Sequence, residues 1–203
     1  MRKRTKKKSS TANREGGFTL LEVLVSVFIV TVGLLGLLGV LGVAMAATQN
    51  SEELAISKRL ANEALESILT ARETDNVDWT QIANGTCNIG QTCGGGNGIF
   101  VPGPLPINNP GVDGVVGTND DATAGPQILD LPGPSGVIAT PAGSPCAPPD
   151  NCISLTNFTR TIAISQFGTD QNLDTVTITV TYTDPALKTP QNYVLSTLIS
   201  QYR

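Results

Sequence analysis

Histidine is absent from this 203-residue sequence. The absence removes the commonest general base, the commonest metal ligand and every catalytic triad built on imidazole. A nucleophile paired with a base, a phosphate-binding loop and a redox Cys-x-x-Cys motif are also missing. We therefore predict that the chain is not an enzyme, and we assign no catalytic and no cofactor-binding residue.

Positive charge is scarce outside the first 17 residues. This short segment holds seven basic residues and one acid, whereas the rest of the chain holds six basic and sixteen acidic residues, a net charge of −10. Phosphate contacts need clustered Lys and Arg. The sequence therefore gives no reason to expect a nucleic-acid partner, and the basic run is interpreted as a targeting segment.

Cysteine occurs four times, in two pairs that each enclose five residues. Paired zinc ligands usually enclose two to four residues, so this spacing favours short disulfide loops in an oxidising compartment. Three connectivities are possible. The local one is favoured, and it joins Cys87 to Cys93 and Cys146 to Cys152.

Charge is also absent from a long apolar run between residues 23 and 51. The run is long enough to cross the hydrocarbon layer of a membrane as a helix, and the basic cluster before it favours a cytoplasmic N-terminus. A removable signal peptide is the alternative, because residues 44–46 (AMA) have the pattern of a cleavage site. The run is longer than such peptides usually are, and the acid Glu22 stands just before it, so we favour a membrane span.

The residues around Glu22 form a recognisable pattern. Residues 14–26 read REGGFTLLEVLVS, which resembles the prepilin motif of type IV pilins and type II secretion pseudopilins. The resemblance implies cleavage between Gly17 and Phe18, N-methylation of Phe18, and an assembly role for Glu22. Many major pilins carry a proline where this chain has Gly39, so the likeness is greater to minor pilins and pseudopilins.

This resemblance also implies partners and a location. The partners are other pilin subunits, bound through the N-terminal helix, and a prepilin peptidase that is also a methyltransferase. The precursor would cross the bacterial inner membrane once, and the mature chain would enter a periplasmic or cell-surface filament. The pairing of Glu22 with the new Phe18 amine of a neighbouring subunit is physically reasonable, because opposite charges attract strongly where the dielectric constant is low.

The remainder of the chain predicts an α+β head. No proline interrupts residues 18–75, and apolar residues recur at helical spacing from residue 51 to 72; Leu54, Ala61, Leu65 and Ile68 or Leu69 mark the apolar face. Strict alternation over 175–183, with similar patterns at 158–165 and 192–200, predicts an antiparallel sheet of three or more strands packed on this helix. The resemblance gives the same architecture, the type IV pilin fold.

Residues 84–150 separate the helix from the strands. They hold 14 glycines and 11 prolines, which predicts a long irregular loop ordered by the disulfides. Within it, Asp113, Asn119, Asp120 and Asp121 offer oxygen ligands suited to Ca²⁺ and similar to the calcium loop of some pseudopilin heads. The alternative is a solvated turn without a metal.

The expected organisation is a basic leader at 1–17, a transmembrane and assembly helix at 18–50, and a head at 51–203. The head would comprise a helix at 51–75, a loop at 84–150 and a sheet at 152–203. The favoured function is a minor pilin of a type IV pilus-like filament. A minor pseudopilin of type II secretion, and an adhesin or binding module at a filament tip, remain alternatives.

Overall fold

The computed structural model describes residues 18–86, 98–130, 152–184 and 188–202. The chain divides into two compact units, Met1–Met45 and Ala46–Arg203. The helix α1 (Leu20–Glu73) contributes residues to both units. Each unit is described by itself.

The first unit consists, where the structure describes it, of the N-terminal part of α1 and the two residues before it. Thr19 caps the helix, because the Glu22 N–H lies 3.0 Å from the Thr19 carbonyl oxygen and 3.3 Å from its Oγ1. The polar side chains of Ser26 and Thr31 donate hydrogen bonds to carbonyls three residues earlier. They can therefore lie in an apolar helix without leaving a donor unpaired.

The second unit begins with the remaining turns of α1. One face of this segment is buried at three- and four-residue spacing, as the sequence pattern predicts; it comprises Ile56, Leu60, Ala61, Ala64, Ile68 and Ala71. Leu54 was expected on this face but is exposed, because the buried stripe starts two residues later, at Ile56. The helix ends where Asp75 adopts a left-handed conformation with φ 56°, and the Asn76 and Val77 N–H groups donate to the Ala71 carbonyl.

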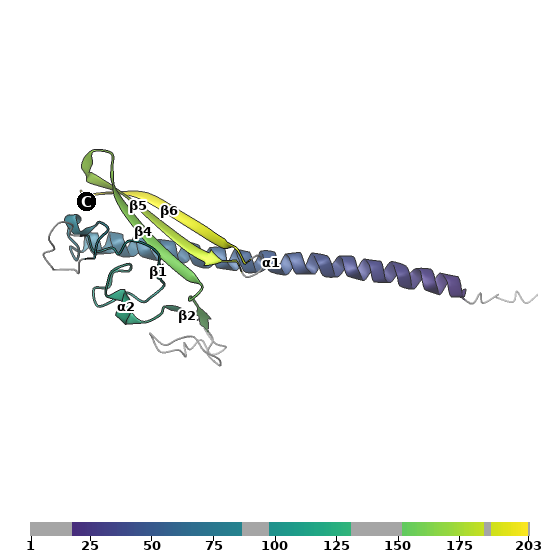
Figure 1. The fold of residues 1–203 in the computed structure, drawn as a ribbon. Helices are drawn as coiled ribbons and strands as arrows, with labels where there is room; N and C mark the ends of the chain where they lie inside the picture. Colours follow the sequence, from purple (N-terminus) through teal and green to yellow (C-terminus); the bar gives the residue numbers. More distant parts are fainter. Residues whose placement is uncertain (1–17, 87–97, 131–151, 185–187, 203) are drawn as a thin grey trace, which may run out of the picture. The chain divides into compact units, whose positions relative to one another are not determined.

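The sheet that covers this helical face has four antiparallel strands in the order β1-β4-β5-β6 (Figure 1). They are β1 (Leu105–Pro106), β4 (Phe158–Phe167), β5 (Asp170–Thr183) and β6 (Pro190–Ser200). The alternation in β5 is confirmed, since Val176, Ile178 and Val180 are buried against the helix and the threonines between them face outward. The expected α+β architecture of a long helix on an antiparallel sheet is thus confirmed.

The glycine- and proline-rich region departs from the prediction of an irregular loop. Its described parts include β1, a short helix α2 (Asp121–Ala124), and β2 (Ile128–Asp130), which pairs with β3 (Cys152–Ser154) in a second, two-stranded sheet. A 3₁₀ turn, η1 (Trp79–Gln81), precedes the region. Several of its apolar residues are buried in the core, namely Ile99, Phe100, Ile107, Val115, Val116 and Leu129. Packing on the sheet and helix therefore orders these parts, in addition to any disulfide.

Asn84 shows how this region is attached to the sheet. Its Nδ2 donates to the Ile162 carbonyl at 2.7 Å, and its Oδ1 accepts from the Ile164 N–H at 2.7 Å. Both groups belong to the backbone of β4. One amide side chain thus occupies a donor and an acceptor that a further strand would otherwise use.

Candidate functional site

The N-terminal candidates lie at the beginning of α1. Phe18 precedes the helix and is 81% exposed, and Glu22 is exposed in the first helical turn. Gly17 lies outside the described residues. Glu22 is four positions after Phe18 in the chain, and three residues lie between them. Cleavage and methylation at Phe18 and the assembly role of Glu22 remain predictions.

Exposed apolar side chains surround the N-terminal part of α1. Among the described residues, α1 is the one helix long and apolar enough to cross a membrane, and its most apolar window is not buried at all. A shallow apolar groove follows the first three turns at three- and four-residue spacing, lined by Phe18, Leu20, Val23, Leu24, Val27, Phe28 and Thr31. Such a surface is stable only in lipid or against other apolar surfaces.

Four glycines follow at intervals of three residues, and they are Gly33, Gly36, Gly39 and Gly42. All four lie in the helix, and a Cβ added at any of them would meet no atom within 4 Å. Packing within the chain therefore does not require them. Small residues in an apolar helix allow the backbone of a neighbouring helix to approach closely.

The acidic candidates of the second unit are brought together. Asp113, Asp120 and Asp121 each offer a carboxylate oxygen within 4.8 Å of the others. Asn119, the fourth expected ligand, is exposed and lines a small cavity beside Asp121. The arrangement needs a glycine at position 111, because a Cβ there would collide with the Asp120 carboxylate.

Most of these carboxylate oxygens also accept hydrogen bonds from the loop. Asp121 accepts from the Gly111 N–H at 3.0 Å and from the Gly117 N–H at 2.6 Å. Asp120 accepts from the Asp113 N–H at 3.2 Å and from the Thr118 hydroxyl at 2.6 Å. The cluster therefore also organises the turn that carries it, as Asx turns do.

Burial and hydrogen bonds together set the direction in which the pKa of each of the three acids shifts. It raises the pKa of Asp121, against the opposing effect of its N–H donors and of the nearby Arg160. It also raises the pKa of Asp113, to which the charge of Asp120 adds. Burial opposes ionisation of Asp120 too, but hydrogen bonds from Thr118 and Asp113 outweigh it and lower the pKa of Asp120.

Sequence reasoning missed Arg160, which lines the same small cavity as Asn119 and Asp121. Its side chain is only 3% exposed, and its Nη1 donates to the Leu60 carbonyl of α1 at 3.5 Å. Burial lowers the pKa of its guanidinium, and the charges of Glu63 and Asp121 oppose that effect. A strand position between two threonines gave no signal of this role, because only the fold brings Glu63 and Asp121 near it.

The predicted disulfides are only partly within the described residues. Cys152, the first residue of β3, is disulfide-bonded. Cys87, Cys93 and Cys146 lie outside the described residues, so the connectivity remains a prediction.

Comparison with known proteins identifies the N-terminal segment. Residues 12–38 match the family model of the prokaryotic N-terminal methylation motif. No curated protein and no solved structure matches this chain. The matched range contains Gly17, Phe18 and Glu22, together with the first half of the apolar helix.

The match supports a type IV pilin-like or prepilin-like protein and does not distinguish the subtype. It indicates a structural protein, and it implies assembly with other pilin subunits and processing by a prepilin peptidase. The apolar helix near the N-terminus fits anchoring in a membrane before assembly.

Proposed function

We propose that this chain is a minor pilin, a structural subunit of a type IV pilus-like filament without catalytic activity. The observation that carries the proposal is the unburied apolar helix, which begins within the matched methylation motif. Neighbouring subunits would cover this helix in the filament, as lipid does before assembly. The absence of a helix proline at position 39 favours a minor pilin over a major one.

Cleavage between Gly17 and Phe18 would convert the stored precursor into the assembling subunit. It removes the seven basic residues of the leader and leaves a net charge of −10 on the mature chain. It also creates an ammonium group on Phe18, next to the membrane. The positive leader keeps the N-terminus cytoplasmic, which leads residues 51–203 to the compartment in which disulfides form.

Glu22 would pair with the Phe18 amine of a neighbouring subunit. A carboxylate beside an apolar helix is costly to hold in lipid, by about 2.5 to 3.5 kcal/mol at a helix centre and less near an end. Pairing with an ammonium group in a medium of low dielectric constant compensates that cost. The contact would neutralise both charges and set the axial register of the subunits.

The test replaces Glu22 by alanine and compares this variant with the same replacement at Glu52. Glu22→Ala should insert in the membrane and be cleaved, but its amount in sheared filaments should fall severalfold or more. Glu52→Ala, which removes an exposed acid further along the same helix, should assemble as the unaltered chain does. Mass spectrometry should detect a peptide that begins with methylated Phe18. If sheared filaments contained the Glu22→Ala variant in the normal amount, this result would contradict the assembly role of Glu22.

Two other functions share the same N-terminus. A minor pseudopilin of type II secretion would assemble into a short periplasmic fibre, and neighbouring secretion genes in place of pilus genes would favour it. An adhesin or binding module would act through residues 84–150 at a filament tip, and binding of the full chain to surfaces or cells would reveal it.

We also propose Ca²⁺ as a ligand of the cluster of Asp113, Asp120 and Asp121, with Asn119 beside it. Carboxylate oxygens within 4.8 Å of one another suit an ion that binds oxygen at about 2.3 to 2.6 Å. Thermal melts with and without a chelator test the proposal. A lower Tm with the chelator supports it, and identical melts would mean that the acids serve only the turn.

A further inference from the structure

A small cavity of about 90 Å³ is lined by residues of β1, of β4 and of the turn that carries the acidic cluster. A water molecule needs about 10 to 15 Å³ of such space, so the cavity has room for several waters or for one small organic molecule. Part of its wall is apolar and comprises Val101, Leu105 and Ile162. The polar part includes the buried side chains of Arg160 and Asp121.

The Arg160 guanidinium has few partners for a buried cation. It carries five N–H donors. Within the described residues it makes one hydrogen bond, from Nη1 to the Leu60 carbonyl, and this bond is long at 3.5 Å. Nε and Nη2 are not among the fully enclosed atoms that lack a partner, so they face open space, which beside Arg160 is the cavity.

The two acids whose charges act on Arg160, Glu63 and Asp121, form their hydrogen bonds elsewhere. Glu63 Oε1 accepts from Gln127 Nε2 at 2.7 Å, and each Asp121 oxygen accepts from a backbone N–H. Among the described residues, neither acid forms an ion pair with Arg160. Their charges lessen the cost of burying the cation, but they leave its N–H donors without an acceptor.

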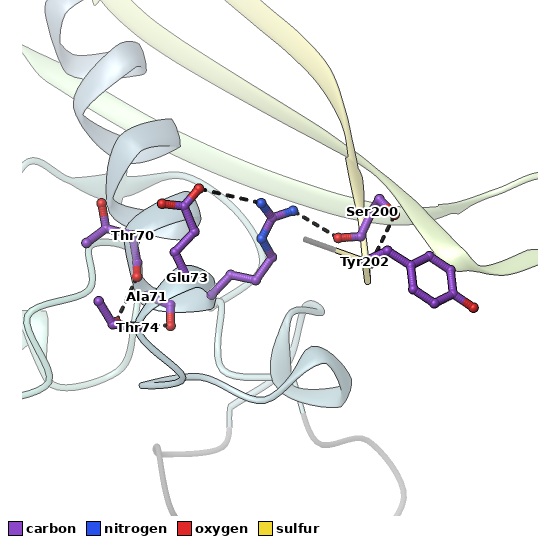
Figure 2. A network of polar contacts seen from close by, with 7 residues as sticks. Thr70, Ala71, Glu73, Thr74, Ser200 and Tyr202 are labelled. Atoms are coloured by element: carbon purple, nitrogen blue, oxygen red, sulfur yellow. Dashed lines mark hydrogen bonds and ion pairs between the residues drawn. The ribbon is translucent and has the colours of Figure 1, made fainter.

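A second arginine of the same unit is better paired, although it is less buried. Arg72 Nη1 donates to the Ser200 carbonyl at 2.9 Å, and its Nη2 lies 3.8 Å from Glu73 Oε1 (Figure 2). The Arg72 side chain is 15% exposed, whereas Arg160 is 3% exposed. The more deeply buried guanidinium thus has the fewer protein partners, which indicates that its acceptor comes from outside the chain.

Two amides add further donors to the cavity. The side chains of Asn108 and Asn119 line it, and neither forms a hydrogen bond with another residue in the described part of the chain. Each amide offers two N–H donors. Together with Arg160 they favour a ligand group that accepts several hydrogen bonds, and a planar guanidinium pairs best with a carboxylate, through two parallel bonds.

We propose that this cavity binds a small monocarboxylate such as propionate. Its carboxylate accepts from Nε and Nη2 of Arg160, and its short apolar end lies against Leu105 and Ile162. The charge of Asp121 in the wall and the net charge of −10 outside the leader disfavour anions of higher charge, such as phosphate. The inference goes beyond filament assembly and does not depend on it.

Calorimetric titration of the full-length chain in detergent tests the proposal. Sodium propionate should show saturable binding of one molecule per chain and, at saturation, should raise the Tm of the Trp79 fluorescence transition by a few degrees. Propionamide has the same shape without the charge and should not bind. The α-amide of N-acetylglutamate carries the same carboxylate on a larger, protein-like group, and it should bind more weakly than propionate.

Two substitutions link the binding to the cavity. Arg160→Lys keeps the positive charge but lacks the planar fork, so it should weaken propionate binding by about tenfold or more. Ala122→Leu fills the cavity from α2 and leaves Arg160 in place, so it should abolish the binding. Ala124→Leu makes the same replacement two residues later in α2, outside the cavity, and should bind as the unaltered chain does.

The opposite results would overturn the proposal. A folded, unaltered chain without saturable binding would mean that water alone fills the cavity, and equal binding of propionamide would exclude the carboxylate. Tighter binding of phosphate, or of the N-acetylglutamate amide, would exclude a free monocarboxylate. Undiminished binding by Ala122→Leu would place the site elsewhere. Since Ala122→Leu leaves the N-terminal helix intact, its amount in sheared filaments should stay normal, which separates this test from that of the pilin function.

Discussion

The two units of this chain use the same apolar residue types in opposite ways. In residues 18–45, every described apolar side chain larger than alanine is exposed, and Phe28 is 67% exposed. In the second unit, Phe100 is completely buried, as are Leu60 and Val176. The first unit thus leaves its hydrophobic surface for lipid or other subunits to cover, and the second buries most of its own.

The difference indicates where each kind of residue acts. Burial of an apolar side chain contributes to folding only when the chain itself provides the covering atoms. Changes in the second unit should therefore alter the free energy of unfolding, whereas changes in the first should alter insertion and assembly. Trp79, the single tryptophan, lies in the second unit, so its fluorescence reports the unfolding of that unit.

The largest expected effect comes from a pair of identical substitutions. Phe100→Ala should lower the free energy of unfolding by about 3 to 5 kcal/mol, because it removes a fully buried ring from the core. Phe28→Ala removes an exposed ring from the first unit and should leave the Trp79 transition unchanged. Denaturant unfolding of the two full-length variants in detergent measures both. Equal shifts would contradict the contrast between the two units.

The buried cation should give a smaller effect. Arg160→Met removes the guanidinium that bonds the Leu60 carbonyl and faces Glu63 and Asp121. The two acids would then lack their positive neighbour, and we expect a loss of about 1 to 3 kcal/mol in the same unfolding experiment. Arg59→Met is the control, since Arg59 is exposed and surface changes usually stay within about 0.5 kcal/mol. A loss no larger than that of the control would show that Arg160 has no structural role.

The smallest effect should be a gain in stability. Burial raises the pKa of Glu53, and the charges of Asp184 and Glu52 add to the shift. Glu53 Oε2 is also buried without a hydrogen-bond partner among the described residues. Glu53→Gln removes the charge, so it should raise Tm by a few degrees at neutral pH. Glu66→Gln, at an exposed position of the same helix, should change Tm less.

The pH dependence of the unaltered chain should agree with this result. Since the folded-state pKa of Glu53 is raised above 4.5, the stability that its protonation provides is complete below that value. It is lost as pH rises through the folded-state pKa. Glu53→Gln should lose this part of the pH dependence of Tm, and an unchanged profile would contradict the assignment.

Short-range patterns predicted much of the fold. The alternation of β5 and the helical spacing of residues 51–72 identified the two layers of the second unit, because each pattern repeats with the period of its element. The predicted apolar face of the helix differs slightly from the buried face, since Leu54 is exposed and Ile56 is buried. The glycine- and proline-rich region was predicted less well, because β1 and the burial of Phe100 depend on contacts with distant residues.

The candidate sites divide in the same way. The motif around Gly17, Phe18 and Glu22 could be recognised from the sequence alone, since its residues lie close together in one linear segment. The cluster of Asp113, Asp120 and Asp121 was also visible, because its members are close in the chain. Arg160 could not be found, since its neighbours Leu60 and Glu63 come from a helix about a hundred residues earlier.

The sequence by itself thus determined the prepilin-like N-terminus, the apolar helix and the period of the long strands, which depend on residues close together in the chain. Only the tertiary structure decided which loop residues enter the core, where Arg160 finds its acids, and which side chains line the cavity beside it. The physical reason is that burial, charge pairing and strand order arise between residues far apart in sequence, whose contact depends on the whole fold.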